Sequence, residues 1–334
     1  MRGNFIALVF LLEIACNIIV LSHQTRSNCS LTFLQYESSH EEKKWFEKVH
    51  LWEKATCSYI SNITVETYLN DIKTINSAAL TRKSTEFSRN SMFDSRHISH
   101  YRYSWKCLGF KKKVVSVPIE GVIGLARDPR KCWNVYSDDY TNSKEYLIPM
   151  SHNYYHFFAN KSNGTNYLFD AGASDYSTSL NRSSMKWLVD TYDGLGIRFD
   201  RLIAWEKRNM SKSQMYDGVP DWLLPGYEYH NYGIESKLNS SKNPLTLIKL
   251  LCKPSDFVVF KLDIDNKRIE MSLMEQIMLD PVLLALIDEF YYEHHFRDSA
   301  MAMHGWMSFT TTLSELYQLI IPMRSKGFRF HYWP

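Results

Sequence analysis

The chain lacks the short motifs that identify several common kinds of site. Its 334 residues contain no CxxC pair and no cysteine spacing typical of a zinc ribbon. Its glycines do not form the Gly-rich turn that holds a pyrophosphate, which argues against a nicotinamide-dependent oxidoreductase. No internal repeat or low-complexity stretch is present. The function therefore has to be inferred from the order of predicted elements and from the polar residues that end them.

Positive and negative charges nearly balance along the chain. The net charge is +3, and the basic run Lys111 to Lys113 is short. A run of three lysines is typical of a solvated loop, so we predict no nucleic-acid binding. The apolar fraction of 45% and charged fraction of 22% are those of a folded chain. The many aromatic residues predict a core rich in rings, and exposed rings can also form platforms for sugars.

The N-terminus resembles a secretory signal. Arg2 precedes an apolar run from Phe5 to Leu21, and Ser22 suits a cleavage site. The run is also nearly long enough to span a bilayer, so an uncleaved signal anchor is the alternative. We expect contact with a membrane only in that case. Residues 1–22 are predicted to direct the chain to the lumen of the endoplasmic reticulum or Golgi, or to secretion.

Asn-X-Ser/Thr sequons agree with this compartment. Each sequon alone is weak evidence, but seven behind a signal-like start predict a glycoprotein. The sequons begin at Asn28, Asn62, Asn160, Asn163, Asn181, Asn209 and Asn239.

The cysteines beyond the signal allow two disulfide bonds and one remaining thiol in an oxidising compartment. Cys107 with Cys132 is a plausible local pair, and Cys29 with Cys57 is another. Sequence spacing does not determine the connectivity.

Two regions of the chain differ in their patterns. Residues 23–149 are polar and weakly periodic, with helices predicted over 41–59 and 65–80 and a strand over 113–123. This region shows no chemical motif, and its role stays open. From residue 150 to 334 short apolar runs alternate with helical patterns, which predicts βαβ units. Strands are predicted over 167–169, 199–205, 227–234, 257–262, 287–292 and 328–333, and helices over 183–192, 244–251, 270–286 and 313–323.

The predicted fold class is α/β. Its main part is a Rossmann-like, mostly parallel sheet flanked by helices, with an N-terminal mixed, partly helical extension. Right-handed crossovers place the C-terminal ends of parallel strands at one edge, where ligands bind. The residues that end these strands are therefore the candidate ligand contacts. They are Asp170, Glu206, Asp263, Asp265, Glu293, His294 and His295.

Four segments, in the same order, resemble motifs of the FkbM-type methyltransferases. They are Phe169-Asp170-Ala171-Gly172-Ala173-Ser174, then Ile203-Ala204-Trp205-Glu206, then the segment from Asp256 to Asn266, and finally the segment from Asp288 to His294. The resemblance covers about residues 150–334. It departs from the family at Asp265-Asn266, where the family has Glu-Gly.

This resemblance implies a class I methyltransferase fold, O-methyl transfer and S-adenosylmethionine (SAM) as cofactor. A glycine after the first strand lets backbone approach a ligand closely. A carboxylate at the end of the second strand is placed to bind the ribose hydroxyls. The expected cofactor-binding residues are Asp170, Gly172, Ser174, Glu206 and Asp263.

A hydroxyl acceptor benefits from a general base that works near neutral pH. His294 or His295, oriented by Glu293, is the first candidate, and Asp265 is the second. The alternative for the histidines is a structural role at a strand end. Asp170 and Glu206 can instead cap or brace loops. Asp263 with Asp265 more often caps a turn than binds a divalent ion, so no metal site is predicted.

Two functions follow from these expectations. The first is a SAM-dependent O-methyltransferase of the secretory pathway, acting on a small molecule or on a glycan hydroxyl. The second is a secreted or membrane-anchored binding glycoprotein that keeps the methyltransferase fold without catalysis, because fold alone does not determine function.

Overall fold

The computed structural model describes residues 29–80, 96–107, 109, 111–136, 138–151, 154, 164–177 and 183–334. The predicted signal at 1–22 and the sequons at Asn28, Asn160, Asn163 and Asn181 lie outside these residues. The other three sequon asparagines, Asn62, Asn209 and Asn239, are exposed, as a glycan requires. Within the described ranges, no helix is long and apolar enough to cross a membrane.

Six parallel strands form the main sheet, in the order β6-β5-β4-β7-β8-β9. The order reverses between β4 and β7, which is the doubly wound Rossmann arrangement. The predicted α/β fold with a parallel sheet is therefore confirmed. The strands are β4 (Asn166–Ala171), β5 (Arg201–Trp205), β6 (Tyr227–His230), β7 (Phe257–Leu262), β8 (Glu289–Tyr292) and β9 (Arg329–Tyr332).

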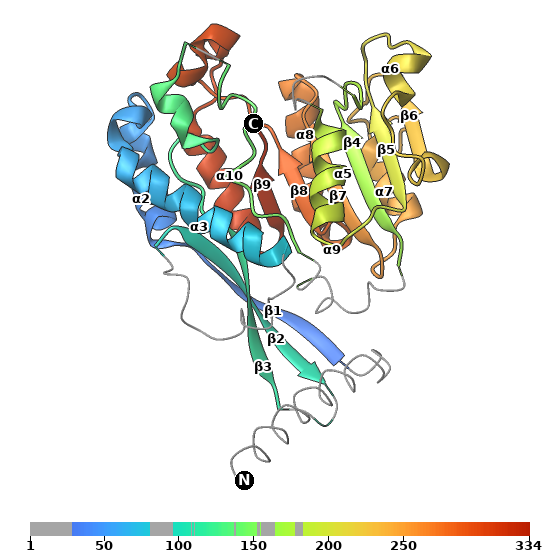
Figure 1. Ribbon diagram of the computed structural model, residues 1–334, viewed down its shortest axis with the longest axis horizontal. Coiled ribbons are helices and arrows are strands. Elements are labelled where there is room, and N and C mark those ends of the chain that lie inside the picture. The colour runs from blue at the N-terminus through green and yellow to red at the C-terminus, as the bar shows by residue number, and fades with distance from the viewer. Residues whose placement is uncertain are drawn as a thin grey trace, which may run out of the picture.

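Helices connect these strands and cover the sheet (Figure 1). Their starts follow local chemistry: Ser183, Asn243 and Thr312 each accept a backbone N–H in the first turn of the helix that follows. The helices are α5 (Ser184–Gly194), α6 (Lys212–Tyr216), α7 (Pro244–Leu251), α8 (Lys267–Leu279), α9 (Pro281–Leu286) and α10 (Leu313–Ser325).

The single helix predicted over 270–286 is two helices in the structure. Asp280 ends α8, and its side chain accepts the N–H of Val282 to begin α9. Pro281 lacks the N–H that would continue α8, and its fixed φ suits the first position of a new helix. By contrast, the prediction of 244–251 as a helix and 257–262 as a strand is confirmed to the residue.

The N-terminal region adds a three-stranded antiparallel sheet, which extends away from the main sheet in Figure 1. Two of its strands were not predicted, because their residues are mostly polar or aromatic and become strands through pairing with one another. Its elements are β1 (Cys29–Glu37), α2 (His40–Trp52), η2 (Thr56–Tyr59), α3 (Asn62–Leu80), β2 (Ile98–Cys107), β3 (Lys113–Glu120) and η4 (Pro129–Trp133).

Buried charges join this region to the main sheet. The guanidinium of Arg324, in α10, lies 3.1 Å from a carboxylate oxygen of Glu42 in α2 and 3.0 Å from one of Glu120 in β3. Glu120 also lies 2.9 Å from Nδ1 of His331, which is in turn 3.4 Å from Glu289. All five side chains are almost completely buried. One hydrophobic cluster likewise contains residues of both regions.

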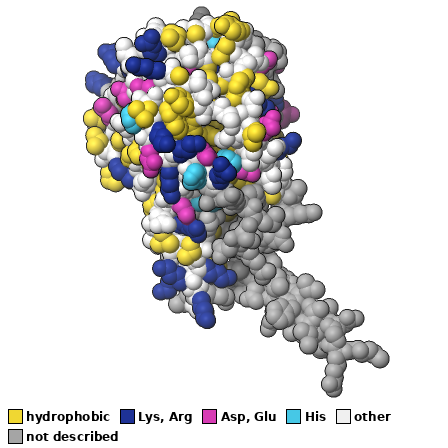
Figure 2. Space-filling model, turned by 90° about the vertical axis from the view of Figure 1, so that its left-hand side faces the viewer, with side chains coloured by type: hydrophobic (Ala, Val, Ile, Leu, Met, Phe, Trp, Pro, Cys, Tyr) yellow, Lys and Arg dark blue, Asp and Glu magenta, His cyan; other side chains and the backbone are white. Residues whose placement is uncertain are grey.

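The surface carries no single dominant charge on the face shown in Figure 2. Its broad upper part mixes hydrophobic, basic and acidic side chains, while Lys and Arg gather towards the narrow lower end. Lys111, Lys112 and Lys113, at the start of β3, are exposed.

A disulfide bond joins Cys57 of η2 to Cys132 of η4, with the two Cα atoms 5.2 Å apart. Both local pairings suggested by spacing, Cys107 with Cys132 and Cys29 with Cys57, are therefore wrong. Tertiary packing brings η4 against η2 across 75 residues, which sequence distance does not reveal. The backbone register instead places Cys29 opposite Cys107 on β1 and β2. The disulfide is compatible with an extracellular or secretory-pathway protein.

Removing this disulfide is expected to destabilise the fold. A bond closing a loop of this length stabilises by about 4 kcal/mol through the chain entropy of the unfolded state. The double variant Cys57→Ala/Cys132→Ala should therefore unfold at a clearly lower urea concentration than the oxidised wild type. Equal midpoints and slopes for the two proteins would contradict the assignment.

The lowered pKa of Glu289 leads us to expect that the folded protein loses stability in acid. Burial raises its pKa, but Arg329, His331 and the N–H of Met150 outweigh this and lower it to about 2, from 4.5. Its contribution is complete above pH 4.5 and is lost as the pH falls towards 2. Glu289→Gln should lower the free energy of unfolding at pH 7 by about 3 kcal/mol. It should also flatten the pH dependence between 4.5 and 2.

The matched control is Glu235→Gln, which changes a half-exposed carboxylate paired with Lys242. Urea unfolding at several pH values measures both variants. A Glu289→Gln protein that retains the wild-type pH dependence would show that this carboxylate does not cause it.

Candidate functional site

The strand ends at the reversal of sheet order are held by Lys261 of β7. Its ammonium nitrogen lies 3.2 Å from Asp170 and 3.2 Å from Asp263, and it donates to the carbonyl of Gly172 at 2.8 Å. Ser184 donates a hydrogen bond to the other oxygen of Asp170. Burial raises the pKa of Asp170, and Lys261 opposes that rise. Asp170 is thus a fully buried partner of Lys261, in the bracing role that the sequence left open.

Gly172 turns the chain sharply after β4. Its φ is +87°, and a Cβ there would lie 1.5 Å from the carbonyl oxygen of Asp263. Only glycine fits so close a contact. The amides of Gly172 and Ala173 both donate to the carbonyl of Trp205. Gly172 therefore allows the turn after β4 to pack closely against the backbone at the end of β7.

Glu206 ends β5 and braces two loops. One carboxylate oxygen accepts the N–H of Ser174 at 3.1 Å, and the other accepts the N–H of Arg208 at 2.8 Å. The Arg208 guanidinium adds an ion pair at 3.2 Å and also donates to the Ser174 hydroxyl. Burial raises the pKa of Glu206, but the bonds from Arg208 and Ser174 outweigh it and lower the pKa. Glu206 is consequently ionised at neutral pH.

A cavity of about 290 Å³ opens at the ends of β7 and β8. The predicted residues Asp265 and His295 line it, as does Glu293, whereas Asp170, Gly172, Ser174, Glu206, Asp263 and His294 are not among its lining residues. Its other walls come from the connection between β3 and β4, from η7 (Ser299–His304) and η8 (Trp306–Ser308), and from the residues after β9. These walls contain Asp138, Thr141, Asn142, Met301, His304, Trp306 and the C-terminal Pro334.

His295 lies at the centre of an ion-pair cluster in this cavity. Its Nε2 is 3.3 Å from an oxygen of Asp265 and 3.3 Å from one of Glu293, and its Nδ1 is 3.6 Å from Glu270. Burial lowers the pKa of His295, but the carboxylates outweigh it and raise the pKa to about 10. Burial and Asp263 raise the pKa of Glu293 well above its usual value, and His295 opposes them. The imidazole is thus protonated at neutral pH.

His294 faces a different environment from its neighbour. It follows β8 in extended chain, where successive side chains point to opposite sides. Its ring lies against Tyr292, and burial, followed by the charge of His295, lowers its pKa to about 4. Of the predicted histidine pair, the structure therefore brings only His295 together with Asp265 and Glu293.

Several residues of the cavity were not found from sequence. Asp138, Thr141 and Asn142 belong to a region without a recognisable motif, and Asp138 lies 3.3 Å from Nε2 of His304. Lys144 lies nearby, and burial lowers its pKa to about 8. Its ammonium donates to the carbonyl of Asn142. No spacing signal connects this segment to the strand ends, because the contact depends on how the β3–β4 connection folds back.

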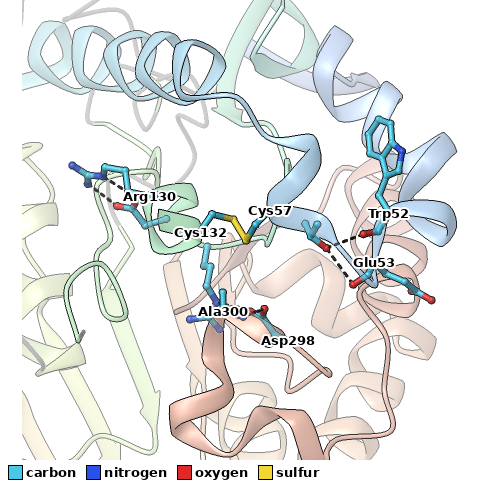
Figure 3. The surroundings of a disulfide bond; sticks show 10 residues. Trp52, Glu53, Cys57, Arg130, Cys132, Asp298 and Ala300 are labelled. Atoms are coloured by element: carbon cyan, nitrogen blue, oxygen red, sulfur yellow. Dashed lines mark hydrogen bonds and ion pairs between the residues drawn. A yellow bond between two sulfur atoms is a disulfide. The ribbon is translucent and has the colours of Figure 1, made fainter. Parts of the chain in front are cut away.

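The disulfide supports these walls. Figure 3 shows Cys57 and Cys132 beside Asp298 and Ala300, at the start of η7. The guanidinium of Arg127 lies over the indole ring of Trp306, 4.5 Å from the ring centroid. The walls opposite the strand ends are therefore held by a covalent bond and by packed side chains.

No family model, curated protein or solved structure matches this chain. The resemblance to FkbM-type methyltransferases over about residues 150–334 thus stays a prediction based on its four segments.

Replacing Lys261 tests the ion pairs at the reversal of sheet order. Lys261→Met leaves Asp170 buried without a compensating charge, which should cost about 3 to 5 kcal/mol of unfolding free energy. The double variant Lys261→Met/Asp170→Asn should recover part of that loss, because it removes both charges. Urea denaturation followed by tryptophan fluorescence measures all three proteins. A Lys261→Met protein as stable as the wild type would contradict this role.

Proposed function

We propose that this chain is a SAM-dependent O-methyltransferase of the secretory pathway. The observation that carries the proposal is the reversal of strand order between β4 and β7, with Glu206 ending the second strand from that point. In doubly wound sheets, nucleotide-like ligands bind at this reversal, and a carboxylate in that position binds ribose hydroxyls. The four segments that resemble FkbM-type methyltransferases indicate SAM as this ligand.

At the reversal of strand order, Glu206 and Ser174 suit contacts with SAM, whereas Asp170 does not. Glu206 is an ionised carboxylate, and Arg208, whose side chain is 65% exposed, can move aside to free it for a ribose diol. The Ser174 hydroxyl lies at the same place. Asp170 does not fit a direct ligand contact, because it is buried against Lys261 and Ser184. When bound, SAM supplies an activated methyl group.

The acceptor belongs in the cavity beside this position. The turn at Gly172 lies against the backbone of Asp263 and Ile264, directly before Asp265. It leads to Ser174, whose backbone N–H donates to Glu206, so the two places adjoin. The Asp265 side chain is 88% exposed and ionised, whereas His295 carries a proton. An ionised Asp265 can accept a hydrogen bond from an acceptor hydroxyl and orient it for methyl transfer, although its lowered pKa makes it a weak base. A glycan hydroxyl is the acceptor expected from the compartment, and polar walls with Trp306 suit a sugar.

A specific observation favours the second candidate, a binding glycoprotein without catalysis. Both oxygens of Glu206 are already bonded within the chain, and the amides of Gly172 and Ala173 donate to Trp205. A ligand must displace at least the Arg208 guanidinium to reach the carboxylate. If that exchange is unfavourable, the fold is retained without a cofactor.

Calorimetric titration of SAM and its demethylated product into the purified chain separates these functions. Glu206→Gln should weaken binding at least tenfold, because a charge-assisted hydrogen bond contributes about 1.5 kcal/mol or more. Arg208→Ala should strengthen binding, because it frees Glu206. The matched control is Arg198→Ala, which removes an exposed arginine paired with Asp193 elsewhere on the surface.

Saturable binding that follows this order among the variants would support the cofactor site and justify a screen of hydroxyl acceptors. Absence of binding to the folded wild type and to Arg208→Ala would overturn the enzyme and leave the binding glycoprotein.

A further inference from the structure

The cluster of His295, Asp265 and Glu293 has the composition of a metal site. We propose that these three side chains bind one divalent metal ion in the cavity, with Glu270 orienting His295. The sequence predicts no such site, because Asp263 and Asp265 together resemble a turn cap. Folding instead turns Asp265 towards the residues that follow β8. This inference does not depend on methyl transfer.

The spacing of the ligand atoms suits a single ion. Nε2 of His295 lies 3.3 Å from an oxygen of Asp265 and 3.3 Å from one of Glu293, and all three ligand atoms lie within 4.8 Å of one another. Atoms bound to one ion at about 2.1 Å in tetrahedral or octahedral geometry are roughly 3 to 3.5 Å apart when adjacent. Only the two carboxylates need to approach each other slightly.

Glu270 supplies the support that metal-binding histidines usually have. Its Oε2 lies 3.6 Å from Nδ1 of His295, and its Oε1 accepts the N–H of Ile264 at 2.9 Å. The side chain is 1% exposed and is fixed at the start of α8. A carboxylate bonded to the far nitrogen of an imidazole leaves the near nitrogen as the ligand. At 3.6 Å the Glu270 carboxylate forms an ion pair with Nδ1 rather than a hydrogen bond; it favours the ring orientation in which Nε2 faces Asp265 and Glu293, and a bound metal would replace the Nε2 proton.

A buried hydroxyl on the opposite wall of the cavity also supports a ligand at this place. Thr141 lines the cavity and is 6% exposed, yet its hydroxyl has no hydrogen-bond partner among the residues that the structure describes. Buried hydroxyls are normally bonded. Asn142 and Asp138 add further oxygen atoms to this wall. Since divalent ions take four to six ligands, positions beyond the three protein ligands are open to water or to oxygens of a bound molecule.

The donor set favours a first-row transition metal. Two carboxylates suit Mg²⁺, Ca²⁺ and Mn²⁺, whereas imidazole suits Zn²⁺ and the later metals. Mn²⁺ accepts both kinds of donor and is the probe of choice. A metal here would bind an acceptor hydroxyl directly and lower its pKa, which deepens the role of the cavity if the methyltransferase proposal holds.

The test is titration of MnCl₂ into the full chain after removal of metals with a chelator and dialysis. Free Mn²⁺ is counted by electron paramagnetic resonance, without SAM. We expect one ion per chain. Asp265→Asn should weaken binding at least tenfold and still fold, because the side chain is 88% exposed and asparagine tolerates its φ of 55°. Glu270→Gln should weaken binding 10- to 100-fold.

The matched control is Asp193→Asn, which removes a surface carboxylate paired with Arg198 and should bind as the wild type does. Saturable Zn²⁺ binding in place of Mn²⁺, weakened by the same variants, would support the site and assign it to zinc. Absence of saturable binding of either ion to the folded wild type would overturn the proposal, as would equal affinities for the wild type and Asp265→Asn. Neither result depends on whether SAM binds.

Discussion

The buried ammonium of Lys261 fixes the edge of the sheet on which the site depends. Burying a lysine ammonium away from water costs free energy unless its charge is compensated. Here Asp170 at the end of β4 and Asp263 directly after β7 compensate it. Its hydrogen bond to the carbonyl of Gly172 holds the tight turn after β4 against the end of β7. The three groups together occupy the reversal of strand order. Any ligand at this edge must therefore bind beside Lys261 rather than between the strands.

Two places beside this edge are the ones proposed for ligands. One is the end of β5, where Glu206 and Arg208 are paired at the surface, and the other is the cavity beyond β7 and β8. The N-terminal region is essential to the second, since the β3–β4 connection supplies a wall. The buried contacts of Arg324 with Glu42 and Glu120 hold that region to the sheet, and the disulfide between Cys57 and Cys132 joins η4, within the β3–β4 connection, to η2. A region without a recognisable motif thus contributes to the candidate site.

The parallel sheet was predictable because buried parallel strands are continuous apolar runs, as in 257–262. The acidic residues that end these runs were found for the same reason, and Asp265 and His295 do line the cavity. The antiparallel strands β1 and β2 were not predictable, because their polar and aromatic residues become strands only through pairing. The sequence contains a signal for the break between α8 and α9, since Pro281 follows the capping residue Asp280. The break was nevertheless missed, because the helical pattern continues on both sides of it.

The sequence by itself determined the alternation of strands and helices, the edge at which polar residues gather, and the number of cysteines available for disulfide bonds. These depend on local periodicity and on the handedness of crossovers, which act within a βαβ unit of about 30 residues. Only the tertiary structure decided that Asp170 is neutralised by Lys261, that Glu206 is bonded to Arg208, and that His295 meets Asp265 and Glu293. Burial and pairing between distant segments set the charge and the accessibility of each group, and neither is encoded by residue type or spacing.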